Sequence, residues 1–409
     1  MRRLFAGTAA ALLAAVLILP VEVNGVSARS ACLMDAVTGQ ILYQCDADRR
    51  SLIASTTKIM TALIVCEQCN VLDRMRIPKE AVGIEGSSMY LKEGEVLTIQ
   101  ELLYGLMLSS GNDAAVALAI YCGGTVEGFV DLMNDKAYSL GLSNTQFENP
   151  NGLDSPGQFS SAKDLAVLAA YAMENPVFAK TVSTKTVRVG ERYLTNHNKL
   201  LWRVPGADGV KTGYTRSAGR TLVSSAVREN RRVIAVTLDD GNDWQDHKVL
   251  LEQGLSRFQP KDLIAEGDLM GTREVLGGEN RQVELLAAEN FRFHLAQGEQ
   301  PYILLSGSEF SYAPVVSGGE AGFAYVMLGD KAVGRVPLVY GQTIEQKQEE
   351  RTLWDKLFGG GKHGSAASET VVGTGSCIPQ KGGGNDPTGA CFRKWPHSAD
   401  RNVGGSPDR

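Results

Sequence analysis

Three short polar motifs in a fixed order constrain this chain more than any other feature. They are Ser-Thr-Thr-Lys from residue 55, Ser-Gly-Asn from residue 110 and Lys-Thr-Gly from residue 211. One such tetrapeptide is a common chance match on a surface helix. Three motifs in this order indicate a serine nucleophile that is activated by a lysine base.

The spacing of the first motif suits that chemistry. Ser55 and Lys58 are three residues apart, so on a helix their side chains share one face and can meet. The following stretch, residues 59–65, is almost wholly apolar, which predicts a buried helix. The reactive pair would then lie in its first turn, where the helix dipole favours a developing oxyanion.

A lysine base must be uncharged, whereas a free lysine has a pKa of roughly 10.4. Burial lowers the pKa because it penalises the ammonium, and a second cation lowers it by repulsion. Lys211 of the third motif can supply that second cation.

Length, charge and the N-terminus limit the classes of protein. At 409 residues the chain fits two domains with extensions, and its net charge of −5 gives no electrostatic case for nucleic-acid binding. Arg2 and Arg3 precede an apolar run that ends before Pro20, and small residues follow at 26–28. We expect residues 1–28 to be a secretory signal peptide; the alternative, a membrane anchor, is disfavoured because the run is short for a span.

Seven cysteines make an odd count for an exported chain, so at least one is free or pairs with another molecule. Cys66 and Cys69 form a CxxC without the further ligands of a zinc site, and are expected to be small core residues at the end of the Ser55 helix. A redox role is a weaker alternative. Whether Cys122 or Cys45 joins a disulfide stays open.

The order of elements predicts an α+β domain over residues 29–258. Residues 31–37 and 40–44 form a hairpin, a helical region extends from 55 to 172, and Thr98 with Glu101 is a capping box within it. Strands follow at 209–215, 221–227 and 232–238, and residues 248–258 form a closing helix. A sheet built from both ends of the segment would therefore enclose a helical cluster.

The remainder of the chain has a different texture. Short strands at 282–287, 291–295, 302–305, 323–328 and 332–340 predict a small all-β domain, residues 259–342. Residues 343–358 are expected to form an amphipathic helix that contacts either a membrane surface or the β-domain. Residues 359–409 are rich in Gly, Ser and Pro and are expected to be a disordered tail.

With these motifs placed, residues 30–358 resemble the low-molecular-mass penicillin-binding proteins, which are serine-type D-alanyl-D-alanine carboxypeptidases of peptidase family S11. The likeness extends beyond the three motifs to residues 54–61, 86–89, 149–153 and 208–215. It implies a penicillin-binding/β-lactamase-like transpeptidase fold followed by the β-domain. It also implies an extracytoplasmic enzyme whose partners are peptidoglycan stem peptides ending in D-Ala-D-Ala and, as covalent inhibitors, β-lactams.

The resemblance implies roles residue by residue. Ser55 attacks the carbonyl between the two D-alanines, Lys58 takes its proton and Ser110 relays a proton to the leaving amine. The substrate-binding residues would be Asn112 for the peptide amide, Lys211 for positive potential, Thr212 for the terminal carboxylate, Gly213 for close approach of the strand, and Tyr214, whose N–H with that of Ser55 would form the oxyanion hole.

One stretch departs from the family pattern. Residues 158–161 read Gln-Phe-Ser-Ser where His-Tyr-Ser-Thr is expected, which puts substrate preference in doubt more than activity. No arginine can be assigned to the terminal carboxylate, although Arg216 and Arg220 are nearest in sequence. We expect no cofactor or metal, because the five histidines are scattered, and His247 is expected to be an exposed helix residue.

Two other functions use the same residues. A β-lactamase shares the nucleophile and differs in how fast it deacylates, but the sequence offers no glutamate in a recognisable deacylation motif. A catalytically silent wall-binding scaffold would keep the pocket for recognition alone, and the intact nucleophile and base argue against it.

Overall fold

The computed structural model describes residues 26–348. The expected signal peptide up to residue 25 and the expected tail from 359 lie outside the described residues, as does the 349–358 part of the expected amphipathic helix. The helices are η1 (Ala54–Thr57), α1 (Lys58–Gln68), η2 (Lys79–Ala81), α2 (Ile99–Leu108), α3 (Asn112–Gly123), α4 (Val126–Ser139), α5 (Ala162–Ala172), α6 (Pro176–Ser183), α7 (Leu200–Arg203) and α8 (Asp243–Ser256).

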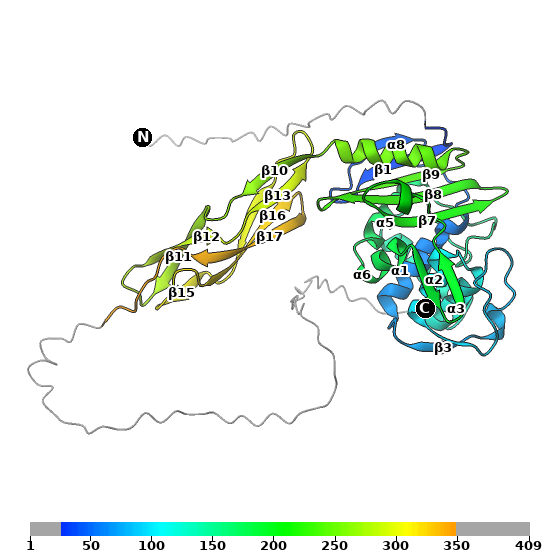
Figure 1. Cartoon of the computed structure of the whole chain (residues 1–409), viewed down its shortest axis with the longest axis horizontal. Helices are drawn as coiled ribbons and strands as arrows, with labels where there is room; N and C mark the ends of the chain where they lie inside the picture. The colour runs from blue at the N-terminus through cyan, green and yellow to red at the C-terminus, as the bar shows by residue number, and fades with distance from the viewer. Residues whose placement is uncertain (1–25, 349–409) are drawn as a thin grey trace, which may run out of the picture. The chain divides into compact units, whose positions relative to one another are not determined.

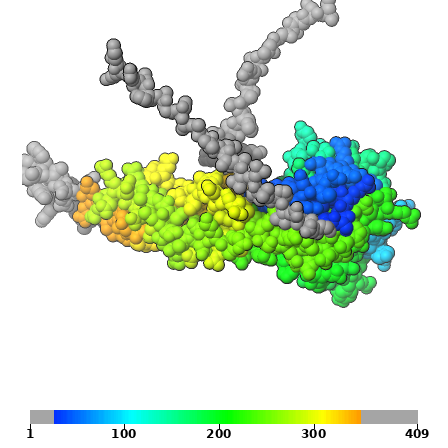
Figure 2. All heavy atoms as spheres, turned by 90° about the horizontal axis from the view of Figure 1, so that it is seen from above, coloured from blue at the N-terminus to red at the C-terminus, as the bar shows by residue number. Residues whose placement is uncertain are grey.

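A five-stranded antiparallel sheet organises residues 26–258, in the order β2-β1-β9-β8-β7. Its strands are β1 (Ser30–Asp35), β2 (Ile41–Cys45), β7 (Ala207–Thr215), β8 (Gly219–Arg228) and β9 (Arg231–Leu238). The predicted hairpin and the three later strands are confirmed. The pairing of β1 with β9 joins the two ends of the segment, and Figure 2 shows the blue and green residues adjoining.

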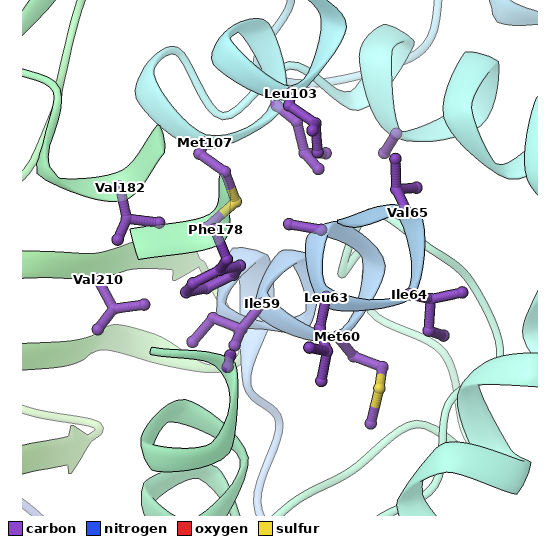
Figure 3. Packing of buried hydrophobic residues seen from close by; sticks show 14 of the residues in the cluster. Ile59, Met60, Leu63, Ile64, Val65, Leu103, Met107, Phe178, Val182 and Val210 are labelled. Atoms are coloured by element: carbon purple, nitrogen blue, oxygen red, sulfur yellow. The ribbon is translucent and has the colours of Figure 1, made fainter. Parts of the chain in front are cut away.

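Helices cover both faces of this sheet. Figure 1 shows α8 along one face and α1, α2, α3, α5 and α6 on the other. Leu250, Leu251 and Leu255 of α8 pack on the sheet residues Leu33 and Leu222. The larger core surrounds α1, whose apolar side chains are almost wholly enclosed (Figure 3). The predicted buried helix is therefore confirmed, and it is the central helix of the cluster.

Local sequence signals define the ends of the helices near the site. The predicted capping box begins α2: Thr98 accepts a hydrogen bond from the Glu101 amide, and the Glu101 carboxylate accepts one from the Thr98 amide. Helix α3 ends at Gly124, whose φ of 75° favours glycine. These helices deliver the second motif to the junction between α2 and α3.

Two short antiparallel strand pairs, one within the helical region and one after it, were not predicted from the sequence pattern. They are β3 (Arg74–Arg76) with β4 (Val96–Thr98) and β5 (Thr186–Val189) with β6 (Arg192–Thr195). The closing helix α8 begins at Asp243, five residues before the expected start at 248. Among residues 26–348, no single helix combines the length and apolarity of a membrane span; α3 and α4 meet that criterion as a pair bent by 83°.

Residues 259–348 are built from β-strands. These are β10 (Gln259–Ile264), β11 (Leu269–Leu276), β12 (Gln282–Ala287), β13 (Phe291–Leu295), β14 (Tyr302–Ser306), β15 (Phe310–Tyr312), β16 (Glu320–Leu328) and β17 (Lys331–Tyr340). Strands β10 and β13 pair with each other, and the others form a sheet in the order β14-β16-β17-β12-β11-β15. All five predicted strands are confirmed, whereas β10, β11 and β15 were not predicted.

The expected helix over 343–358 is wrong where the structure describes it. Residues 343–348 are extended: Ile344 bridges to Val315 and Gln346 bridges to Gly278. Ile344 is buried with Val275 and Val283. The apolar side chain of Ile344 therefore packs on the β-sheet rather than on a helical face.

Candidate active site

Ser55 lies in the 3₁₀ turn η1, immediately before α1, and not within the α-helix itself. Ala54, the preceding residue, has a φ of 46°, a strained conformation for a residue with a side chain. The start of the turn is fixed by Thr221 of β8, whose hydroxyl donates to the Ile53 carbonyl at 3.1 Å. The backbone on either side of Ala54 is therefore held in one conformation beside the sheet, and this fixes the position of Ser55.

Two glycines allow other segments to approach the Ser55 amide. A Cβ on Gly213 would lie 3.0 Å from Ser55 N and 2.3 Å from Thr221 Oγ1, and a Cβ on Gly152 would lie 2.0 Å from the Ala54 carbonyl oxygen. Gly152 also has a φ of 87°. Only residues without a side chain fit at these two places.

Lys58, the first residue of α1, is fully buried and connects the first motif to the second. Its Nζ lies 3.0 Å from Ser55 Oγ and donates to Asn112 Oδ1 at 2.7 Å and to the Asn151 carbonyl at 2.5 Å. A neutral amine has two N–H donors and one lone pair. The two oxygens would satisfy both donors, leaving the lone pair to accept the Ser55 hydroxyl.

The surroundings of Lys58 favour its neutral form. Burial, and secondly the positive charge of Lys211, hold the pKa of Lys58 well below its usual value, while Asp113 acts weakly in the opposite direction. Lys211 is buried as well, and burial lowers its pKa to about 7. Its Nζ donates to the Thr212 carbonyl at 2.8 Å. Both causes of the lowered lysine pKa that the sequence suggested are thus present.

The second motif is held by the residues that flank it. Asn112 donates through Nδ2 to the Glu85 carbonyl at 2.6 Å, which orients its Oδ1 toward Lys58. Asp113 accepts hydrogen bonds from the Ser88 hydroxyl and from the Met89 and Leu91 amides. The loop between η2 and β4 is therefore fastened to the first turn of α3, beside the site.

Ser110 lies in the same cleft but is not joined to the lysines. It is almost buried, has a φ of 59°, and lines the cleft together with Ser55. Within the described residues, no side-chain hydrogen bond connects it to Ser55, Lys58 or Lys211.

The third motif lies on β7, the edge strand of the sheet. Thr212, Gly213 and Tyr214 line the cleft, and β7 packs beside η1. Tyr214 is largely exposed. An edge strand has unpaired backbone groups, so an extended peptide can pair with β7. A carbonyl group of that peptide can then face Ser55.

The cleft, of about 360 Å³, contains residues that the sequence motifs did not predict. They are Ser87, His197, Lys199, Arg220, Asp243 and Trp244. Arg220 is bonded to Asp243 through Nε and Nη2 and lies 5.7 Å above the Trp244 ring. Its side chain remains 43% exposed, so it is oriented yet accessible to a ligand. The Gly86-to-Met89 likeness included Ser87, and Arg220 is close in sequence to the third motif. Asp243 and Trp244 lie in the first turn of α8, His197 and Lys199 lie just before α7, and these four carry no spacing signal.

Two sequence expectations change. His247 is not exposed: it is fully buried on α8 between the Ser224 and Thr237 hydroxyls, because α8 begins earlier and turns this face to the sheet. In the divergent 158–161 stretch, Gln158 accepts hydrogen bonds from the Glu148 and Asn149 amides. Gln158 therefore supports the loop that carries the Asn151 carbonyl. Among the described residues no cluster of His, Cys, Asp or Glu could hold a metal ion.

Comparison with known proteins gives two family matches. Residues 19–242 match the family described as D-alanyl-D-alanine carboxypeptidase, Peptidase_S11. Residues 258–346 match the family described as penicillin-binding protein 5, C-terminal domain.

Individual relatives agree with these matches. D-alanyl-D-alanine carboxypeptidase DacD of Escherichia coli is 36% identical over 340 residues, 78% of this chain and 87% of the relative. D-alanyl-D-alanine carboxypeptidase DacF of Bacillus subtilis is 35% identical over 285 residues, 66% of this chain and 73% of the relative. The crystal structure of penicillin-binding protein 6B from E. coli is 32% identical with a TM-score of 0.57, covering 77% of this chain and 96% of that one.

Proposed function

Because the chain belongs to the D-alanyl-D-alanine carboxypeptidase family, Peptidase_S11, we propose that Ser55 is its nucleophile and Lys58 the base that activates it. The protein is a serine-type D-alanyl-D-alanine carboxypeptidase and a penicillin-binding protein, which acts on peptidoglycan and binds β-lactams. The observation that carries the residue assignment is the buried Lys58 amine, with two oxygen acceptors and Ser55 Oγ at 3.0 Å.

Acylation begins with proton transfer from Ser55 Oγ to the neutral Lys58 amine. The serine oxygen attacks the carbonyl carbon between the two terminal D-alanines, and the tetrahedral intermediate collapses as the C–N bond breaks. The leaving amine takes a proton that Lys58 acquired, relayed by the Ser110 hydroxyl. Water then hydrolyses the acyl-enzyme and frees the shortened peptide.

The oxyanion is stabilised by the backbone N–H groups of Ser55 and Tyr214. Gly213 and Gly152 leave the Ser55 amide accessible, because a side chain on either would crowd it. Donors of this kind are worth roughly 2.7–4 kcal/mol each in the transition state. Asn112, held by Lys58 and Glu85, is positioned to bond the substrate's peptide amide.

The terminal carboxylate is recognised by positive charge and hydroxyl donors. Thr212 and the potential of Lys211 serve this role on β7, and Arg220 of the next strand adds a guanidinium at the same cleft. Although Asp243 neutralises part of its charge, Arg220 keeps exposed N–H groups. A carboxylate is the ligand that such a set prefers.

Release of D-alanine tests these assignments. The full chain without residues 1–28 is incubated with diacetyl-Lys-D-Ala-D-Ala, beside the Ser55→Ala variant. Release by the unchanged protein and its loss in the variant support Ser55 as the nucleophile. Equal release from both proteins would overturn the assignment.

The activity requires an extracytoplasmic location, with which the relatives are consistent, and we propose that residues 1–28 direct export. We also propose a peptidase domain at 29–258 and a β-domain at 259–342. A peripheral membrane contact would rest on Leu353, Trp354, Leu357 and Phe358. Flotation with anionic vesicles, with and without residues 349–409, tests it: equal flotation would contradict the contact.

A further inference from the structure

A group of cysteines lies at the far ends of the two helices that begin at the active site. Helix α1 begins with Lys58 and is followed at its C-terminus by Cys69, while α3 begins with Asn112 and has Cys122 in its last turn. The Cys69 and Cys122 thiols are close enough to alter each other's pKa, and both side chains pack against the core that surrounds α1. Cys122 Sγ also donates to Oε1 of Gln68, the neighbour of Cys69, at 3.7 Å.

Both thiols are accessible from solvent. Cys69 and Cys122 are each half-buried, and in the described part of the chain neither belongs to a cluster that could hold a metal. The proposed extracytoplasmic location exposes them to oxidants, because disulfides form and persist in such compartments. We propose that Cys69 and Cys122 form a disulfide bond that fastens the C-terminal end of α1 to that of α3.

The opposite pKa shifts of the two thiols give the order of events. The interaction between them lowers the pKa of Cys122, whereas the same interaction and burial raise the pKa of Cys69. The Cys122 thiolate therefore attacks first, on a sulfur of a small-molecule or protein disulfide oxidant. A mixed disulfide forms and the other sulfur of the oxidant leaves as a thiolate.

The second step closes the bond. Cys69 loses its proton to solvent and attacks Cys122 Sγ, which expels the remaining thiolate of the oxidant. The two cysteines lose two electrons and two protons in all, and one disulfide of the oxidant becomes two thiols. Burial raises the pKa of Cys66, one helical turn earlier, to about 12, and Cys122 is not among the groups that affect it, so we assign Cys69 as the partner of Cys122.

The bond would constrain the part of the chain that carries the second motif. It closes the segment between residues 69 and 122, which includes Ser110 and Asn112. A crosslink across such a loop lowers the entropy of the unfolded chain. We expect reduction to lower the melting temperature by roughly 5–15 °C.

Peptide mapping tests the disulfide directly. The full chain without residues 1–28 is oxidised with glutathione disulfide, then denatured, alkylated without reduction and digested with trypsin. We expect the peptide of residues 59–74 joined to the peptide of residues 93–136, with Cys66 alkylated. Both Cys69 and Cys122 alkylated as free thiols would overturn the proposal.

The variant Cys66→Ser is the matched control, because it removes the neighbouring thiol of the same peptide. It should keep both the crosslink and the shift in melting temperature on reduction, whereas Cys69→Ser should lose both. If the crosslink disappears in Cys66→Ser, the partner of Cys122 is Cys66 and not Cys69, and the proposal is wrong. If Cys69→Ser does not fold, the mapping of the unchanged chain and of Cys66→Ser decides. D-alanine release, measured separately, reports on Ser55 and does not depend on this bond.

Discussion

Among single residues, an uncharged Lys58 is the one on which the proposed catalysis depends most. Its amine is buried, lies near a second buried lysine, and has hydrogen-bond partners that a neutral amine satisfies completely. Since the pKa of Lys58 is lowered, the deprotonated fraction grows as the pH rises through that lowered value. The rate of acylation by a β-lactam should therefore rise over that range.

The variant Lys58→Arg tests this role, because a guanidinium keeps its proton in proteins. We expect the acylation rate to fall roughly 10²–10⁴-fold, the usual contribution of a general base. Stopped-flow measurements with a chromogenic cephalosporin across the pH range would show it. A near-normal rate in the variant would mean that another group is the base.

Gly213 should tolerate no side chain. In Gly213→Ala the new Cβ would lie 3.0 Å from Ser55 N and 2.3 Å from Thr221 Oγ1, so either β7 or η1 must move. We expect kcat/KM for D-alanine release to fall at least 10-fold, because misplaced catalytic groups are costly. Gly241→Ala is the control, since a Cβ there meets no atom within 4 Å. An equal fall in kcat/KM in both variants would argue against crowding of Ser55 and Thr221 by the new Cβ.

Substitution of Arg220 tests recognition of the terminal carboxylate separately from the nucleophilic chemistry of Ser55. In Arg220→Ala we expect kcat/KM to fall about 10-fold or more for a substrate with a free terminal carboxylate, and less for the same peptide with an amidated C-terminus, because a charge-assisted hydrogen bond is lost. Arg216→Ala, an exposed neighbour, should behave like the unchanged protein. If kcat/KM falls equally for both substrates, Arg220 supports the shape of the cleft and does not bind the carboxylate.

At the scale of elements, the packing of α8 on the sheet includes a buried neutral histidine. Burial lowers the pKa of His247 to about 3, whereas an unfolded histidine has a pKa of about 6.5. Between these values the unfolded chain binds more protons than the folded one, so stability falls as the pH falls. His247 alone makes the free energy of unfolding change with pH by up to about 1.4 kcal/mol per pH unit.

His247→Gln should flatten that dependence, because glutamine can bond Ser224 and Thr237 without titrating. Urea unfolding of both proteins between pH 4 and pH 7.5 measures it. Parallel pH profiles for the two proteins would show that His247 does not contribute.

Sequence patterns predicted elements well where the signal is local. The capping box at Thr98 and the hairpin of β1 and β2 were readable because neighbouring residues determine them. The burial of His247 was not, since it depends on which face α8 turns to strands elsewhere in the sequence. Residues 343–348 were misread because pairing with Val315 and Gly278 is non-local and overrides helical periodicity.

The three motifs could be recognised from the sequence for a related reason, because each is a contiguous stretch. The chemistry of Ser55, Lys58 and Lys211 follows from their side chains. The rest of the cleft could not be predicted. His197, Lys199 and Trp244 come from separate segments that the fold brings together. The strained φ of Ala54 likewise has no sequence signature.

At the scale of the whole molecule, Arg231 joins segments that are far apart in sequence. It is fully buried, its Nη2 bonds Asp35 at 2.5 Å and Glu299 at 2.6 Å, and its guanidinium lies 4.2 Å above the Phe258 ring. It also donates to the His294 carbonyl. One cation therefore satisfies groups from the central sheet and from the strand-rich segment that follows.

Arg231→Met should destabilise the protein by roughly 3–5 kcal/mol, because it leaves the Asp35 carboxylate buried without its charged partner. Differential scanning calorimetry measures the loss. Arg228→Met, at an exposed end of β8, is the control and should change little. The folded fraction of Arg231→Met should still release D-alanine, since Arg231 does not line the cleft. A melting temperature equal to that of the control would contradict the proposed role.

Ser55 is tested as the nucleophile most directly by locating the acyl group after reaction with benzylpenicillin. Intact-mass and peptide mapping of the full chain without residues 1–28 should find one penicilloyl ester, on Ser55, and none in Ser55→Ala. An adduct on another residue, or labelling that persists in Ser55→Ala, would contradict the assignment of Ser55 as the nucleophile.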